Sequence, residues 1–201
     1  MASSLRSEPE VRLFVALEIP TAVRDNLAAQ IKELRDLPAA LADRRLRWVR
    51  TENLHVTLKF IGEVRATKLD GIRSALTPMV LHAPVDLHFR GLGFFPDEKH
   101  PRVLWAGLNA SGNLPVLARD IDRALAAQGI ARDERAFTPH LTLARFESRG
   151  LHEKLLTAIR KNSEREFGAF QAREFHLIQS KLKPSGAEYT SLAAFPLTLE
   201  A

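Results

Sequence analysis

The four-residue pattern His-x-Thr-Leu occurs twice in this chain, as HVTL at residues 55–58 and as HLTL at residues 140–143. Successive side chains of a β-strand point to opposite faces, so each motif on a strand would place its histidine and threonine together on one face. The apolar residues of the motif would face the other way, toward a core. If the two strands lie near one another, two imidazoles and two hydroxyls face a common groove.

Two imidazoles are what in-line attack on a phosphodiester can use without a metal ion. The ordinary histidine pKa of about 6.5 allows one ring to be neutral and the other protonated near neutral pH. The neutral ring takes a proton from the attacking oxygen and the protonated ring gives one to the leaving oxygen, each transfer contributing roughly 10²–10⁴-fold. Thr57 and Thr142 can donate hydrogen bonds to the non-bridging phosphate oxygens. A single histidine on a strand is more often a surface residue, but here His55 and His140 share one context among only seven histidines.

The hydrophobic periodicity places both motifs on strands, at residues 55–60 and 140–146. It also predicts four helices, which begin at Thr21 as an N-cap and near residues 66, 114 and 151. Further strands are expected at residues 12–18, 45–50, 85–94, 102–108, 174–182 and 189–197. The pattern indicates an α+β or mixed α/β protein, with a disordered lead-in at residues 1–10 and one domain at residues 11–201.

The composition excludes several functional classes. The chain of 201 residues is 45% hydrophobic, carries a formal net charge of +5 and contains no cysteine. Disulfide scaffolds, cysteine-ligated zinc sites, iron–sulfur clusters and thiol catalysis are therefore excluded. No segment resembles a signal peptide or a bilayer span, so we expect a cytoplasmic protein without membrane association. The basic excess favours an anionic partner such as nucleic acid or a phosphate ester, although a basic surface without a specific partner explains it equally well.

Segments along almost the whole chain resemble the bacterial and archaeal RNA 2′,3′-cyclic phosphodiesterases. This group, also called the 2′-5′ RNA ligase family, belongs to the two-histidine (2H) phosphoesterase superfamily. The resemblance departs from the family pattern at Ala136, where proline is usual, and in the extra lead-in. The matching segments are RLFVAL at 12–17, WVRTENLHVTLKFIGEV at 48–64, PRVLWAG at 101–107, FTPHLTLAR at 137–145 and SKLKPSGAEY at 180–189.

The resemblance implies a bilobal α+β fold, in which two pseudo-symmetric lobes of antiparallel-rich sheet plus helices surround a central cleft. It also implies hydrolysis of RNA 2′,3′-cyclic phosphate ends, or of such nucleotides, to 2′-phosphomonoesters, with no metal and no other cofactor. By this resemblance His55 is the general acid toward the leaving 3′-oxygen and His140 is the general base that activates water. The reverse reaction would join RNA ends by a 2′-5′ bond. We expect a monomer that acts in RNA processing.

Arg145 matches a phosphate-contacting arginine of the family, and a guanidinium suits that task. Its offset of five residues from His140 is odd, however, so in a regular strand it would point to the opposite face. A bulge or strand end near Ala144 would bring it round; otherwise it is a solvated surface arginine. Lys59 has the same parity as His55, and we expect it to be a charge at the rim of the groove.

Aromatic side chains supply weaker candidates for substrate binding. Phe14 and Tyr189 could stack a base, although Phe14 lies in a strand of buried type and is also expected in the core. Trp48 lies among four arginines, as in a single-stranded RNA track. A solvated edge strand with a buried tryptophan explains this segment equally well. The four arginines are Arg44, Arg45, Arg47 and Arg50.

Four other function classes can be weighed against a metal-independent phosphodiesterase. A non-catalytic RNA-binding module on the same fold would share the basic charge but would not need both histidines. A metal-dependent hydrolase fits poorly, because the two histidines are far apart in sequence and lack the usual ligand spacings. Serine hydrolysis and nucleoside triphosphate hydrolysis lack their motifs, since neither Gly-x-Ser-x-Gly nor Gly-x-x-x-x-Gly-Lys-Ser/Thr is present.

Overall fold

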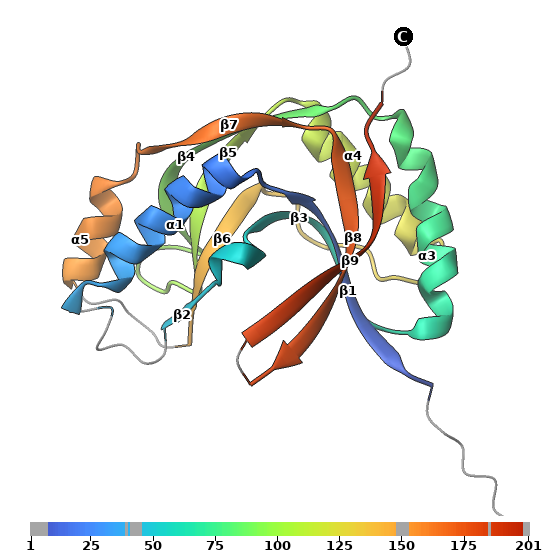
Figure 1. Ribbon diagram of the computed structural model, residues 1–201, viewed down its shortest axis with the longest axis horizontal. Helices are drawn as coiled ribbons and strands as arrows, with labels where there is room; N and C mark the ends of the chain where they lie inside the picture. The colour runs from blue at the N-terminus through green and yellow to red at the C-terminus, as the bar shows by residue number, and fades with distance from the viewer. Residues whose placement is uncertain (1–7, 39, 41–45, 148–152, 185, 199–201) are drawn as a thin grey trace, which may run out of the picture.

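A single antiparallel sheet of nine strands forms the centre of the computed structural model, which describes residues 8–38, 40, 46–147, 153–184 and 186–198 (Figure 1). The strands are β1 (Glu10–Glu18), β2 (Leu46–Trp48), β3 (His55–Arg65), β4 (Val85–Phe95), β5 (Val103–Ala110), β6 (His140–Phe146), β7 (Glu166–Ala172), β8 (Glu174–Lys183) and β9 (Gly186–Pro196). The α-helices within the described ranges are α1 (Thr21–Arg35), α3 (Leu69–Leu76), α4 (Asn113–Ala126) and α5 (Glu153–Lys161). Short 3₁₀ helices cover Thr51–Asn53, Ala66–Lys68 and Thr77–Leu81.

The sheet consists of two halves that meet where β3 lies beside β6. Its strand order is β7-β4-β5-β6-β3-β1-β8-β9, and β2 pairs with β6 outside this path. The only register pair between β3 and β6 is Val56 opposite Leu141, whereas each strand pairs over a longer stretch with its outer neighbour. Each half thus has four strands on the main path, and the motif strands are the innermost of each. The expected α+β fold with two similar lobes is confirmed.

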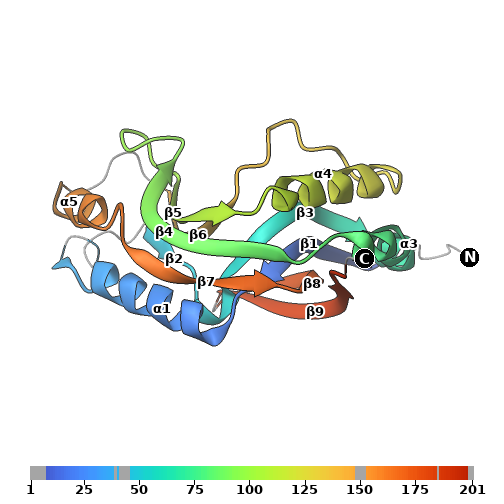
Figure 2. The same cartoon turned by 90° about the horizontal axis from the view of Figure 1, so that it is seen from above.

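Each half is covered by two helices (Figures 1 and 2). α1 contacts β7 and α5, and α5 contacts β4, whereas α4 contacts β3 and α3. The expected apolar stripes face the core, since Val23, Leu27, Ile31 and Leu34 of α1 are all buried. α1 follows β1 in the chain but packs on the other half, and α4 follows β5 and likewise crosses over. These crossovers tie the two halves together. No helix in the described part of the chain is long and apolar enough to span a membrane.

Local details differ from the sequence-based predictions at the ends of elements. Thr21 is the first residue of α1 rather than its cap, because Pro20 holds the N-cap position. The helix expected from residue 66 to 81 is divided into α3 and a short 3₁₀ helix on each side of it. Pro78, which lacks the N–H of a continuous helix, lies in the first turn of the second 3₁₀ helix, Thr77–Leu81. Strand β7 was not predicted, because its sequence contains a glycine and only a weak apolar alternation.

Several predictions fall partly outside the described residues. Residues 1–7 of the expected lead-in, Arg44, Arg45 and Leu151 of the fourth helix lie there. The end of the expected lead-in is ordered, however, because Glu10 belongs to β1 and the Pro9 carbonyl accepts a hydrogen bond from the Ala66 N–H. Strand β1 therefore begins at the last residue of the expected lead-in.

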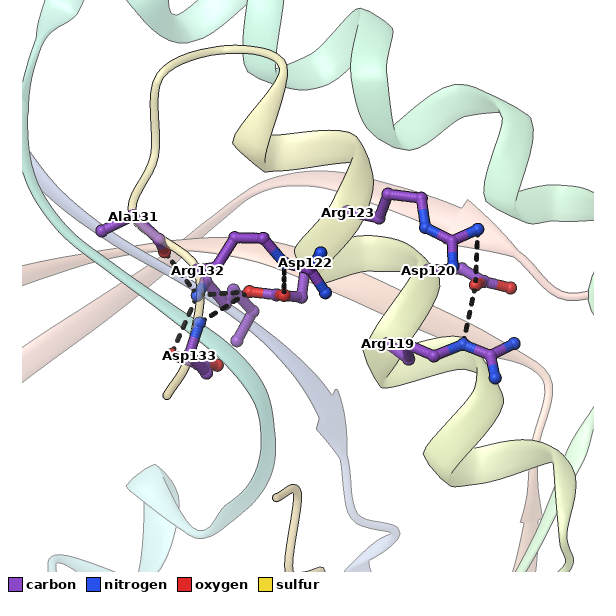
Figure 3. A network of polar contacts seen from close by, with 8 residues as sticks. Arg119, Asp120, Asp122, Arg123, Ala131, Arg132 and Asp133 are labelled. Carbon is purple, nitrogen blue, oxygen red and sulfur yellow. Dashed lines mark hydrogen bonds and ion pairs between the residues drawn. The ribbon is translucent and has the colours of Figure 1, made fainter. Parts of the chain in front are cut away.

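Lys59 is a core residue, so its prediction as a rim charge is wrong. Its side chain is only 1% exposed, and its ammonium lies 2.7 Å from Asp122, 2.9 Å from Asp133 and 2.8 Å from the Ala131 carbonyl. Figure 3 labels these three partners. The reason is a bulge in β3, where Leu58 and Lys59 are both buried and strict alternation is lost. Lys59 thereby joins β3 to α4 and to the start of the segment that leads to β6.

Asp122 is the centre of this network. Burial raises the pKa of Asp122, but hydrogen bonds from Lys59, from Arg132 and from the Asp133 N–H outweigh it and lower the pKa from 3.8 to about 2. A carboxylate with a lowered folded-state pKa stabilises the fold above its unfolded pKa, and this stabilisation is lost as the pH falls through 3.8 toward 2.

We expect Lys59→Met to destabilise the protein strongly, because it leaves the buried Asp122 without its closest cation. Breaking a buried ion pair on one side costs about 3–5 kcal/mol of unfolding free energy, measurable by urea denaturation. Lys32→Met is the matched control, since Lys32 lies at the same 2.7 Å from Asp36 but is 71% exposed. Removing that surface pair should cost at most about 0.5 kcal/mol. Equal losses in the two variants would contradict the role assigned to Lys59.

Candidate active site

His55 and His140 are held in the same way by the backbone just before their strands. Nδ1 of His55 lies 2.7 Å from the Asn53 carbonyl, and Nδ1 of His140 lies 2.8 Å from the Thr138 carbonyl. A carbonyl oxygen only accepts, so in both rings Nδ1 carries the proton and donates it. Nε2 of each ring is thereby left to accept or donate a proton. The side chain of Asn53 also donates to the Ala187 carbonyl at 2.7 Å, which fixes this turn against β9.

Both motifs face one cavity of about 590 Å³, a size typical of ligand sites. The cavity brings together seven of the eight residues predicted from the sequence. It is lined by Arg12, Phe14, Val49, His55, Thr57, Phe60, His140, Thr142, Arg145, Ser180, Leu182, Ala187 and Tyr189. The eighth predicted residue, Trp48, does not line it.

Arg145 reaches the cavity through a bulge of the kind that its odd offset required. Leu104 and Trp105 are adjacent on β5, but they pair with Ala144 and Thr142 of β6, so Leu143 is the extra residue. Leu143 and Ala144 are both buried, and Arg145 returns to the same face as His140. The alternative of an outward-facing Arg145 is therefore wrong.

Aromatic rings surround both histidines. Ring centroids of Phe14 and Tyr189 lie 4.7 and 5.4 Å from that of His55, and Phe14 and Tyr189 are 5.0 Å apart. Phe14 is only 4% exposed, so it is a core residue that also forms part of the cavity wall. Phe95 lies edge-on to His140 at 4.9 Å. Sequence reasoning missed Phe95, because it lies on β4, two strands away from His140.

The predicted RNA track around Trp48 is not seen in the described residues. Trp48 is partly buried against the hydrophobic core, as the alternative interpretation expected. Arg47 is exposed and pairs with Glu147 at 2.6 Å, and Arg50 pairs with Glu52 at 2.5 Å. These two arginines already have acidic partners.

Burial lowers the pKa of His55 below its usual value of 6.5, and the positive charge of Arg145 lowers it further. The Asn53 carbonyl opposes this, because accepting from Nδ1–H favours the imidazolium. Burial raises the pKa of the Tyr189 hydroxyl, whereas the positive charges of Arg145 and Arg12 lower it. The cavity therefore combines a positive field with a histidine that is mainly neutral near pH 7 in the free protein.

Sequence reasoning also missed several residues of the cavity wall. Arg12 and Phe60 complete its wall, together with Ser180, Leu182 and Ala187 of the β8–β9 hairpin. Arg12 could have been found, since it has the same strand parity as Phe14. Phe60 could not have been found, because the bulge at Leu58 and Lys59 turns its side chain to the face opposite to the one that strand alternation predicts. In the described part of the chain, no group of three or more histidine, aspartate or glutamate side chains could hold a metal ion.

A two-lobed antiparallel sheet that presents one His-x-Thr motif from each half to a shared cavity is the architecture of the two-histidine phosphoesterases. A model of the 2′-5′ RNA ligase superfamily matches residues 23–184. The chain belongs to that superfamily.

Relatives and solved structures agree with this assignment. The chain is 35% identical to the RNA 2′,3′-cyclic phosphodiesterase of Archaeoglobus fulgidus over 185 residues, which cover 92% of this chain and 99% of the relative. It is 32% identical to the enzyme of the same name from Methanothermobacter thermautotrophicus, with 94% and 100% covered. The crystal structure of E. coli LigT complexed with 3′-AMP superposes with a TM-score of 0.74 at 25% identity, with 94% and 99% covered.

We expect Arg145→Gln to raise the pKa of His55, because the variant removes a positive charge that disfavours the imidazolium. Histidine ring ¹⁵N chemical shifts followed over pH would measure this directly. Arg47→Gln is the control, since Arg47 is paired with Glu147 and does not line the cavity. An unchanged or lowered pKa of His55 in Arg145→Gln would contradict the placement of Arg145.

Proposed function

We propose that this protein hydrolyses RNA 2′,3′-cyclic phosphate ends to 2′-phosphomonoesters. One observation carries the proposal: two histidines from two halves of the sheet line one cavity, each with Nδ1 tied to the backbone and Nε2 left for proton transfer. A general acid and a general base on either side of a phosphorus atom are what in-line displacement requires. The names of the archaeal relatives support the same reaction.

The two rings exchange one proton each with the substrate. Nε2 of His140 accepts a proton from water as the water oxygen forms its bond to phosphorus. The bond between phosphorus and the 3′-oxygen breaks, and Nε2 of His55 donates its proton to that oxygen. The phosphate stays on the 2′-oxygen, and no metal or other cofactor takes part. A 5′-hydroxyl that replaces water as the attacking nucleophile would form a bond to phosphorus as the bond to the 3′-oxygen breaks, and would give a 2′-5′ bond.

The lowered pKa of His55 must be reconciled with its role as the acid. In the free protein, burial and Arg145 favour the neutral ring. A bound cyclic phosphate brings a negative charge next to the imidazole, and an opposite charge favours the protonated form. Substrate binding therefore favours protonation of His55, next to the oxygen that receives the proton.

Arg145 and the two threonines stabilise negative charge on the phosphate. Arg145, Thr57 and Thr142 line the same cavity as the histidines. A guanidinium can bind two phosphate oxygens at once, and hydroxyl donors hold the charge that builds up in the transition state. The protein acts as a monomer in this account, because both lobes and both histidines belong to one chain.

We expect His55→Ala and His140→Ala each to lower kcat for a 2′,3′-cyclic oligonucleotide by roughly 10²–10⁴-fold, because each removes one proton transfer. The assay contains excess EDTA and separates 2′-phosphate from 3′-phosphate products. His100→Ala is the control, since His100 is exposed and does not line the cavity. It should turn over like the wild type.

Three results would contradict the proposal. A 3′-phosphate product would contradict the bond that is broken, and loss of activity with EDTA would contradict metal independence. RNA binding without turnover in the wild type, unchanged when both histidines are replaced, would instead identify a non-catalytic RNA-binding module.

A further inference from the structure

Two exposed apolar side chains line the cavity. Across the described residues, only three large hydrophobic side chains are exposed, namely Phe60, Val116 and Leu182. Phe60, at 49% exposure, and Leu182, at 70%, both line the cavity, whereas Val116 lies on α4. Apolar surface that stays exposed inside a cleft is typical of a ligand site.

A β-bulge turns Phe60 into the cavity, as the equivalent bulge in β6 does for Arg145. In β3, Leu58 and Lys59 are buried side by side, as Leu143 and Ala144 are in β6. Phe60 therefore holds the place in one motif that Arg145 holds in the other. The buried ion pairs of Lys59 fix the bulge, so the direction of the ring is built into the fold.

The ring of Phe60 lies near Gly62 of the same strand and is covered by a cation. A Cβ placed on Gly62 would lie 3.7 Å from Cε1 of Phe60, so the ring lies toward the far end of β3. The guanidinium carbon of Arg12 lies 4.7 Å from the ring centroid, a cation–π contact. Phe14, in contrast, lies against His55. The cavity wall thus has a buried aromatic ring, Phe14, against His55 and an exposed one, Phe60, under Arg12.

We infer that Phe60, Arg12 and Leu182 form a stacking subsite for the base of the nucleotide that precedes the cyclic phosphate end. This inference rests on the proposed function. The reacting phosphate must lie at the two histidines, where Phe14 and Tyr189 are also found, so the exposed ring of Phe60 is left to meet the next base along the chain. Stacking on an aromatic ring accepts any base, and Arg12 is placed to meet the phosphate that joins the two nucleotides. The substrate class is therefore an oligonucleotide end rather than a free cyclic mononucleotide.

The test compares kcat/KM for a 2′,3′-cyclic mononucleotide with that for a dinucleotide that ends in the same cyclic nucleotide. The wild type should prefer the dinucleotide by roughly 5- to 150-fold, the range for stacking of one base. In Phe60→Ala this ratio should fall toward one. Phe60→Trp should keep the ratio, because an indole stacks a base as well as a phenyl ring does. Val116→Ala, which removes exposed apolar surface elsewhere, should have the wild-type ratio.

Two results would overturn the subsite. A wild-type ratio near one would mean that no second base is bound. Equal losses on both substrates in Phe60→Ala, with the ratio unchanged and the circular dichroism spectrum native, would place the ring at the terminal base instead. Failure of the wild type to turn over either substrate would contradict the proposed function itself, which separates the two ideas.

Discussion

A single register pair, Val56 opposite Leu141, joins β3 to β6 and with them the two halves of the sheet. Both residues are fully buried second members of their motifs, so the pair fixes the motifs at the same level in the sheet. Because strand side chains alternate, His55 and His140 then face the same side. The helices that cross from one half to the other, α1 and α4, keep this narrow junction from opening. The cavity depends on that junction, since neither half carries both histidines.

The motif strands share a second constraint, a bulge at the leucine that ends each His-x-Thr-Leu pattern. In β6 it turns Arg145 toward the cavity, and the small Ala144 fills the buried position. In β3 it turns Phe60 toward the cavity, and Lys59 occupies the buried place. A lysine there is tolerated only because Asp122, Asp133 and the Ala131 carbonyl surround its ammonium. That network also anchors the start of the segment that leads to His140, so a buried charge in one half helps to position the motif of the other.

The sequence predicts the parts of this structure that follow from periodicity. Both motif strands, the apolar stripes of α1 and α4 and the shared face of His55 and Thr57 need only local alternation. The place of Arg145 could be predicted with a stated condition, since its odd offset demanded a bulge. The prediction for Lys59 was wrong because nothing in the sequence indicates the equivalent bulge in β3. In a regular strand, a lysine four residues after His55 would lie on the same face as His55, as a charge at the rim of the groove would. Phe60, Phe95 and β7 depend on register and on packing across strands, which one sequence does not specify.

The pH dependence of kcat/KM on a 2′,3′-cyclic phosphate substrate, in excess EDTA, tests the central claim that two imidazoles share the reaction as acid and base. A bell-shaped profile is predicted, with one limb for each histidine of the free protein and one of the two pKa values below 6.5, because burial lowers that of His55. Replacement of either histidine should abolish the corresponding limb. A profile that is flat between pH 5 and 8, or one with a single limb that both histidine variants retain, would contradict the account.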